Sequence, residues 1–234
     1  MAGVRAGWML CLAFAVGVIV VSAIMMPMFP KTGGDYPPGI GEPVFAFEMV
    51  QSAEDLVGVF GAEDDPDRPA RMTAMDQGNR WDYAFMLVYG GYVCSFFLAA
   101  RRASGNSIWL LPATLGVVAP LSDAIENAIL LGLTADPVAA PNVQYLGYFV
   151  WCKFICLMFC GIAAGWHVIG TGSIGWRIAG NLMIAGSLTV AAAFIATETW
   201  GGIIGQGLAV VWVVQLIYVT VRVAKPGPLN SSQV

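Results

Sequence analysis

Residues 108–133 read IWLLPATLGVVAPLSDAIENAILLGL. A helix needs about 20 largely apolar residues to cross a bilayer, and this run is long enough. It nevertheless contains Asp123, Glu126 and Asn127, and the apolar run that follows carries Lys153. Ionisable side chains at membrane depth are costly, so they normally face protein or water and have partners. This stretch therefore predicts both a membrane-spanning helix and a buried polar site.

Similar apolar runs recur along the whole chain of 234 residues, of which 58% are hydrophobic and only 11% charged. That apolar excess rules out a water-soluble globule. The net charge of -4 argues against nucleic acid as a partner, because phosphate binding needs a basic face. We expect an all-α, polytopic transmembrane bundle forming a single domain, 1–234, with six spans at about 7–28, 83–100, 108–133, 143–166, 178–197 and 201–221.

The first apolar run has two interpretations. Arg5, the apolar residues and the small residues Val21-Ser22-Ala23 could form a cleaved secretory signal. Apolar character continues to Met28, before a break at Pro30, which favours a retained membrane anchor.

Basic residues predict the orientation, because Lys and Arg accumulate on the cytoplasmic side of a membrane protein. We expect a bacterial inner (plasma) membrane protein with both termini in the cytoplasm. The basic residues near the expected cytoplasmic ends are Arg5, Arg101, Arg102, Arg177, Arg222 and Lys225.

The long outer loop, 30–81, begins with a turn-rich segment and continues with an amphipathic pattern at about 44–60. Phe47, Val50, Val57 and Phe60 follow helical spacing there. The pattern predicts an amphipathic helix. We expect it to lie on the membrane surface or cap the bundle; a lid over an outward-facing pocket is the alternative.

The polar residues of the third and fourth spans should meet. Asp123, Glu126 and Asn127 share one helical face. Asp123 and Lys153 each lie ten positions, roughly 15 Å, from the outer end of their span. The short connection between the spans makes them neighbours, so we expect an Asp123–Lys153 ion pair, with Glu126 replacing Asp123 if the register slips by a turn.

Two tyrosines of the second span lie at a similar depth. Tyr89 and Tyr92 are deep enough to donate their hydroxyls to the carboxylates. Pro120, inside the third span, leaves the carbonyl of Gly116 without its usual donor and should kink the helix beside the acidic residues.

The charges of this site do not balance. Two acids and one lysine leave a negative charge if all ionise, so one carboxyl, with Glu126 as the first candidate, should hold a proton. We expect a ligand- or proton-binding site formed by Asp123, Glu126, Asn127, Lys153, Tyr89 and Tyr92. The alternative is a structural network that fixes the register of the helices.

Two functions fit these features. The first is binding or transport of a small polar solute, lipid headgroup or proton, with Lys153 contacting anionic groups and Asp123 or Glu126 exchanging protons. The second is an accessory or structural subunit of a larger membrane complex, whose polar cluster only holds the bundle together. Membrane lipids, other membrane subunits or a second copy of the chain would then be its partners.

Enzymatic activity is the least favoured of the functions considered. Acid and base are present, but neither a nucleophile system nor a metal-ligand set accompanies them. His167 is the only histidine, which excludes bis-histidine haem and HExxH zinc chemistry. We expect no metal and no cofactor.

The segment Leu121-Ser-Asp-Ala-Ile-Glu-Asn, followed by a lysine in the next span and preceded by an amphipathic outer loop, resembles uncharacterised bacterial multi-pass membrane proteins of similar layout. The resemblance covers about spans two to four. It implies a membrane location and brings no activity with it.

Overall fold

The computed structural model describes residues 2–136 and 142–225, and these form helices and connecting loops without a strand. Six helices are long and apolar enough to cross a membrane, which confirms the all-α, six-span bundle of a multi-pass membrane protein. They are α1 (Ala2–Met25), α4 (Arg68–Ser104), α5 (Leu110–Ala135), α6 (Val143–Ile169), α7 (Ile174–Ile195) and α9 (Ile203–Ala224).

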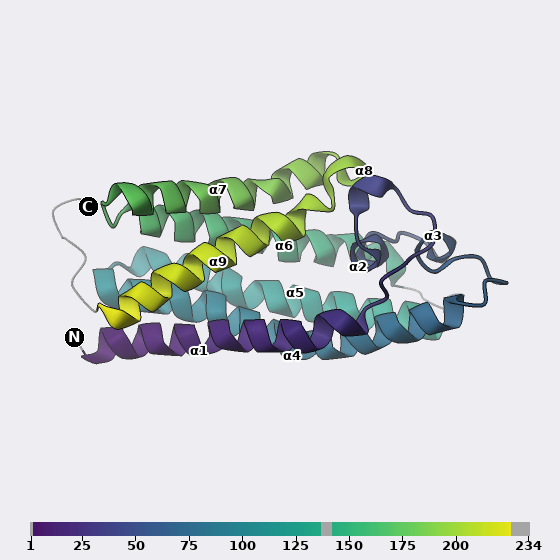
Figure 1. Cartoon of the computed structure of the whole chain (residues 1–234), viewed down its shortest axis with the longest axis horizontal. Coiled ribbons are helices and arrows are strands. Elements are labelled where there is room, and N and C mark those ends of the chain that lie inside the picture. Colours follow the sequence, from purple (N-terminus) through teal and green to yellow (C-terminus); the bar gives the residue numbers. More distant parts are fainter. Residues whose placement is uncertain (1, 137–141, 226–234) are drawn as a thin grey trace.

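The six long helices form a closed ring in which α1 contacts α4, α4 contacts α5, and so on through α6, α7 and α9 back to α1. Figure 1 shows them side by side along one axis. The start of α1 and the end of α9 lie at one end of the bundle, and α2, α3 and α8 lie at the other. We call the end that carries these short helices the outer end.

The outer end is built from short elements. They are the 3-10 turn η2 (Pro38–Ile40) and the helices α2 (Pro43–Glu48), α3 (Leu56–Phe60) and α8 (Thr197–Trp200). Two further 3-10 turns, η1 (Met26–Met28) and η3 (Ser107–Trp109), flank α1 and α5.

The amphipathic segment differs from expectation, because the single helix expected at about 44–60 is two short helices, α2 and α3. The Asp55 carboxylate accepts hydrogen bonds from the backbone N–H groups of Gln51 and Ser52, at 2.8 and 2.9 Å. An aspartate that bonds nearby backbone in this way stabilises a turn rather than a helix. Phe47 and Phe60 still pack together, with ring centroids 5.1 Å apart, so both helices present their apolar faces inward.

Helix α4 begins earlier than expected, at Arg68, so residues 68–81 belong to this helix and not to the outer loop. The Arg71 guanidinium lies 2.7 Å from the Asp65 carboxylate, an ion pair that holds the chain just before the helix against its first turn. At its other end α4 stops at Gly105, whose positive φ of 72° is a conformation that glycine adopts without strain.

Helices α4 and α5 approach closely at Pro120, which lies inside α5. A Cβ at Gly90 would lie 2.7 Å from the Pro120 ring, and a Cβ at Gly116 would lie 2.7 Å from the Val93 side chain. Only glycine permits this approach, which brings the polar residues of the two helices within contact distance.

Candidate functional site

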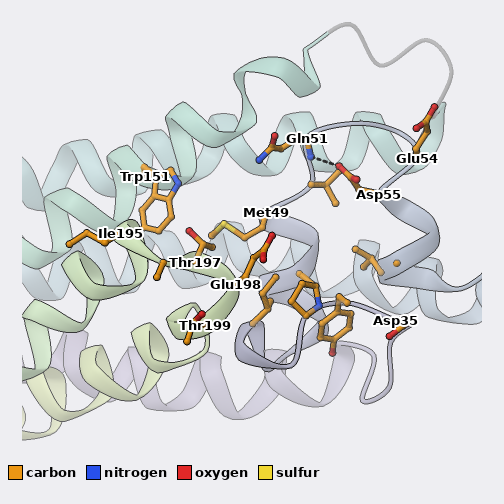
Figure 2. Close-up of a pocket in the computed structure, with 18 residues that line it drawn as sticks. Asp35, Met49, Gln51, Glu54, Asp55, Trp151, Ile195, Thr197, Glu198 and Thr199 are labelled. Atoms are coloured by element: carbon orange, nitrogen blue, oxygen red, sulfur yellow. Dashed lines mark hydrogen bonds between the residues drawn. The ribbon is translucent and has the colours of Figure 1, made fainter.

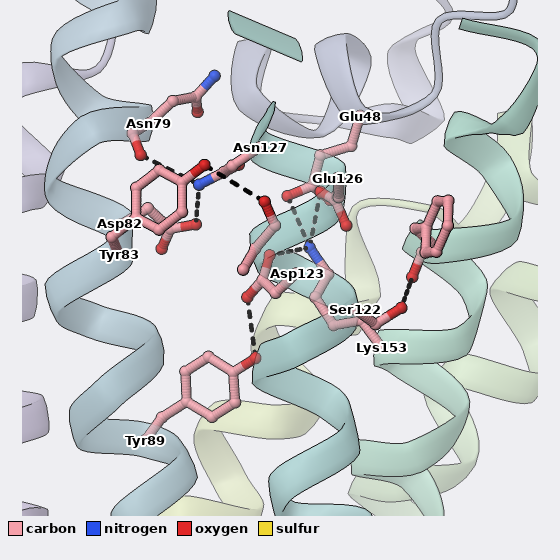
Figure 3. A network of polar contacts seen from close by, with 12 residues as sticks. Glu48, Asn79, Asp82, Tyr83, Tyr89, Ser122, Asp123, Glu126, Asn127 and Lys153 are labelled. Carbon is pink, nitrogen blue, oxygen red and sulfur yellow. Dashed lines mark hydrogen bonds and ion pairs between the residues drawn. The ribbon is translucent and has the colours of Figure 1, made fainter. Parts of the chain in front are cut away.

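The centre of the site is Lys153, buried in α6 and in contact with three carboxylates. Its Nζ lies 3.1 Å from Asp123 Oδ1, 2.9 Å from Glu126 Oε1 and 3.1 Å from Glu48 Oε1. The side chains of Lys153, Asp123 and Glu126 are 6%, 5% and 0% exposed, so water contributes little to their solvation. Figure 3 shows the three carboxylates converging on the ammonium group.

The predicted Asp123–Lys153 ion pair is confirmed. Glu126 does not replace Asp123 as the partner of the lysine; it binds the same ammonium from the next turn of α5. The depth count thus placed the two helices in the correct register, because α5 and α6 are antiparallel neighbours.

Glu48 was absent from the expected site. It is the last residue of α2, and its side chain is 14% exposed. We call residues 29–67, which precede α4 and include α2 and α3, the outer segment. Phe45, three positions earlier, stacks on Phe154 of α6 with ring centroids 5.4 Å apart. Residues three apart on a helix share a face, so α2 is docked on α6 through an aromatic contact and an ion pair.

A second acid that was not expected, Asp82, joins through Asn127. The Asn127 amide donates to Asp82 Oδ2 at 2.9 Å and to the backbone carbonyl of Asn79 at 3.0 Å. Asn79, Asp82 and Tyr89 follow helical spacing on α4, a signal available in the sequence. The span expected at about 83–100 begins after Asp82, but the helix continues outward past this residue.

The two tyrosines behave differently. Tyr89 donates its hydroxyl to Asp123 Oδ2 at 2.9 Å, as predicted. The prediction for Tyr92 is wrong, because its hydroxyl donates to the backbone carbonyl of Trp212 at 3.1 Å and contacts no carboxylate. The rings of Tyr89 and Trp212 stack with centroids 5.9 Å apart, so aromatic side chains form the inner floor of the site.

The polar cluster is therefore Lys153 with the acids Glu48, Asp82, Asp123 and Glu126, held by Asn127 and Tyr89. One ammonium faces four carboxyl groups, a net charge of -3 if all ionise. Glu48 Oε2 and Glu126 Oε2 are buried and have no hydrogen-bond donor among the residues that the structure describes. Buried charge without a partner is strongly unfavourable, so a fully ionised cluster is not stable in this environment.

Glu48 lies outside the membrane-spanning helices, and its pKa is raised above the ordinary carboxyl value. Burial is the largest cause, and the nearby Asp123 charge adds to it, whereas Lys153 acts in the opposite direction. The Glu48 carboxyl is also within hydrogen-bonding reach of Glu126. Two carboxyl groups in contact can share a proton, which would satisfy both oxygens.

Among the described residues, the polar cluster included, no set of three or more His, Cys, Asp or Glu side chains is arranged so that it could hold a metal ion. No family model, characterised protein or solved structure matches the chain. The function of the polar cluster must therefore be inferred from its geometry alone.

Proposed function

We propose that the polar cluster is a proton-binding site of this multi-pass membrane protein. The observation that carries the proposal is the contact of one buried ammonium with three carboxylates, while a fourth lies next to them through Asn127. A proton on one of these acids reduces the excess negative charge and supplies a donor for a carboxylate oxygen that has none.

The cluster would exchange its proton with the outer side. Glu48 reaches the cluster from the outer segment. Of the three acids that contact Lys153, it has the most exposed side chain. On the inner side, Tyr89 donates to Asp123 and its ring stacks on that of Trp212. An outer entrance and an aromatic floor favour proton binding linked to an event at the outer face, such as uptake of a small polar solute or a lipid headgroup.

We further infer that the end opposite α2 and α3 faces the cytoplasm of a bacterial inner membrane. The basic residues Arg101, Arg102 and Arg222 lie in the last turns of α4 and α9, the ends expected on that side. The excess of Lys and Arg at one side of a membrane protein supports a cytoplasmic location for that side.

A second function is supported by the way in which the cluster joins α2, α4, α5 and α6. Such a network can fix the positions of helices without chemistry, as in an accessory subunit of a larger membrane complex or in a homo-oligomer. Gentle purification from native membranes with mass spectrometry of bound proteins tests this function. Stoichiometric protein partners would support it, provided that the proton titration described next shows no extra proton.

Proton counting tests the first function. The triple variant Glu48→Gln, Asp82→Asn, Glu126→Gln keeps the Asp123–Lys153 pair and removes the excess charge. Weakly buffered protein in a nonionic detergent is titrated with acid from alkaline pH down to the upper limit of ordinary carboxyl titration. Over this range the wild type should take up at least one more proton than the variant.

The control variant Asp35→Asn, Glu54→Gln, Glu63→Gln removes three exposed carboxyls instead. It should take up as many protons as the wild type over that pH range. Equal uptake by the wild type and the variant of the polar cluster would contradict proton binding.

A further inference from the structure

A second feature of the outer end is an open cavity of about 940 Å³. Its walls are parts of the segments 35–40 and 46–59, Trp151 of α6 and the α7–α8 turn at 195–199, and we call it the outer cavity (Figure 2). Pockets for small organic molecules measure about 300–1,000 Å³, so its size is suitable for one.

Acidic side chains surround the outer cavity. Asp35, Glu54, Asp55 and Glu198 come from three different segments, and no Lys, Arg or His is among the described residues of its walls. Figure 2 shows these carboxylates on different sides of the hollow. A concave surface with charges of one sign concentrates the field and attracts ligands of the opposite charge. The charge of the walls therefore favours a cation as the occupant of this cavity.

Aromatic and apolar side chains complete the walls, which distinguishes the outer cavity from a solvated acidic surface. Trp151 lies against Phe194, with ring centroids 4.9 Å apart at 88°, so its indole is held in place. Tyr36 is a second aromatic residue of the walls, and Ile195 is 84% exposed. Indole is the strongest aromatic partner for an organic cation, and apolar walls favour a ligand with an apolar body.

Backbone contacts fix the walls relative to one another. Gly202 N–H donates to the Gly39 carbonyl at 2.8 Å, which ties the 35–40 segment to the start of α9. Gly34 N–H donates to the Val59 carbonyl at 2.8 Å, which ties the same segment to α3. A Cβ at Gly39 would collide with the Glu198 carbonyl oxygen, so only glycine allows the segment to lie this close to α8. The cavity is thus largely preformed, which lowers the entropic cost of binding.

We propose that the outer cavity binds an organic cation with an apolar body, such as a quaternary or protonated amine, presented from the outer side. The carboxylates attract its charge, Trp151 contacts its cationic group, and Ile195 contacts its apolar part. The carboxylates of this binding site are distinct from those of the polar cluster, and the segment that contains α2 and α3 is shared by the two sites.

Isothermal titration calorimetry of the full chain in a nonionic detergent tests the proposal, with benzyltrimethylammonium as the probe. Benzyl alcohol, which has the ring without the charge, should bind much more weakly. The variant Glu54→Gln, Glu198→Gln should weaken binding of the probe about fivefold, because it removes two of the exposed carboxylates that attract the positive charge. Trp151→Leu should weaken it about threefold, the effect of one exposed cation–π contact.

The matched control is Glu63→Gln, Asp64→Asn, which removes the same amount of charge from the segment between α1 and α4 but outside the cavity. This variant should bind the probe as the wild type does. An equal loss in the control would mean that only the general negative field attracts the cation, and would overturn the site. Absence of binding to the wild type, or equal binding of benzyl alcohol, would overturn it as well.

Discussion

Glu48 Oε1, on a short helix outside the membrane-spanning helices, lies 3.1 Å from Nζ of Lys153 in the middle of α6. This contact joins the outer segment to the buried charges of α5 and α6. The protonation of the polar cluster and the position of α2 are therefore linked, so a measurement of one reports on the other.

Raising the pH should loosen α2. The raised pKa of Glu48 means that the docked state holds a proton more tightly than an undocked one. Docking is thus most stable below the ordinary carboxyl range and weakens as the pH rises through the raised value. Ionised Glu48 then faces Asp82, Asp123 and Glu126, and in the described part of the chain Lys153 alone is a counter-charge there.

Hydrogen exchange of residues 43–60, corrected for the intrinsic effect of pH, measures this loosening. In Glu48→Gln, which mimics the protonated side chain, exchange should be independent of pH. The exposed Glu54→Gln should behave as the wild type. Equal pH dependence in Glu48→Gln would mean that another group controls the docking.

The contribution of the Phe45–Phe154 contact to the docking of α2 should not depend on pH. Phe45→Ala removes the ring that stacks on Phe154 and should weaken docking of α2 by about 0.5–1.5 kcal/mol at every pH. The same exchange measurement checks this, with Val57→Ala, which alters an exposed side chain of α3, as the control. A pH-dependent effect of Phe45→Ala would contradict the view that the aromatic contact and the Glu48–Lys153 ion pair stabilise α2 independently.

Replacing Lys153 should strongly reduce the stability of the protein. Lys153→Met leaves three carboxylates without their common donor, and removing one partner of a buried pair costs about 3–5 kcal/mol. Thermal unfolding in detergent should show a large drop in stability, partly reversed by adding Asp123→Asn and Glu126→Gln.

Lys31→Met, which alters an exposed lysine of the outer loop, is the control for this loss and should unfold as the wild type does. Wild-type stability of Lys153→Met would show that the cluster does not depend on the ammonium group.

The proposed orientation can be tested with a membrane-impermeant maleimide on intact cells. A cysteine introduced at Glu63, in the outer segment, should react, whereas one at Lys225, at the end of α9, should react only after the membrane is opened. The wild-type chain, whose five cysteines lie in the long helices, gives the background. The reverse pattern would place the outer cavity in the cytoplasm.

The part of the site that follows helical periodicity could be predicted from the sequence. Asp123 and Lys153 lie at equal depth in consecutive spans, so a count of residues was enough to pair them. Asp82 was within reach of the same reasoning, since Asn79, Asp82 and Tyr89 share a face of α4. The apolar run ends next to Asp82, so the predicted span leaves this residue out, whereas the helix continues past it.

Glu48 could not be found in this way. Its position depends on how the chain folds between α1 and α4, where a turn at Asp55 interrupts the amphipathic pattern. The docking of α2 on Phe154 is a tertiary contact, and no local spacing encodes it. Tyr92 shows another limit of prediction from the sequence. Its depth in the span does not determine the direction of its hydroxyl, which donates to the backbone carbonyl of Trp212.

Infrared spectroscopy gives the most direct test of proton binding by the polar cluster. At neutral pH the wild type should show the C=O stretch of a protonated carboxyl group, shifted on exchange into deuterated water and absent from the variant Glu48→Gln, Asp82→Asn, Glu126→Gln. A spectrum without this band until the pH falls into the ordinary carboxyl range would show that all four acids are ionised, and would contradict the proposed function.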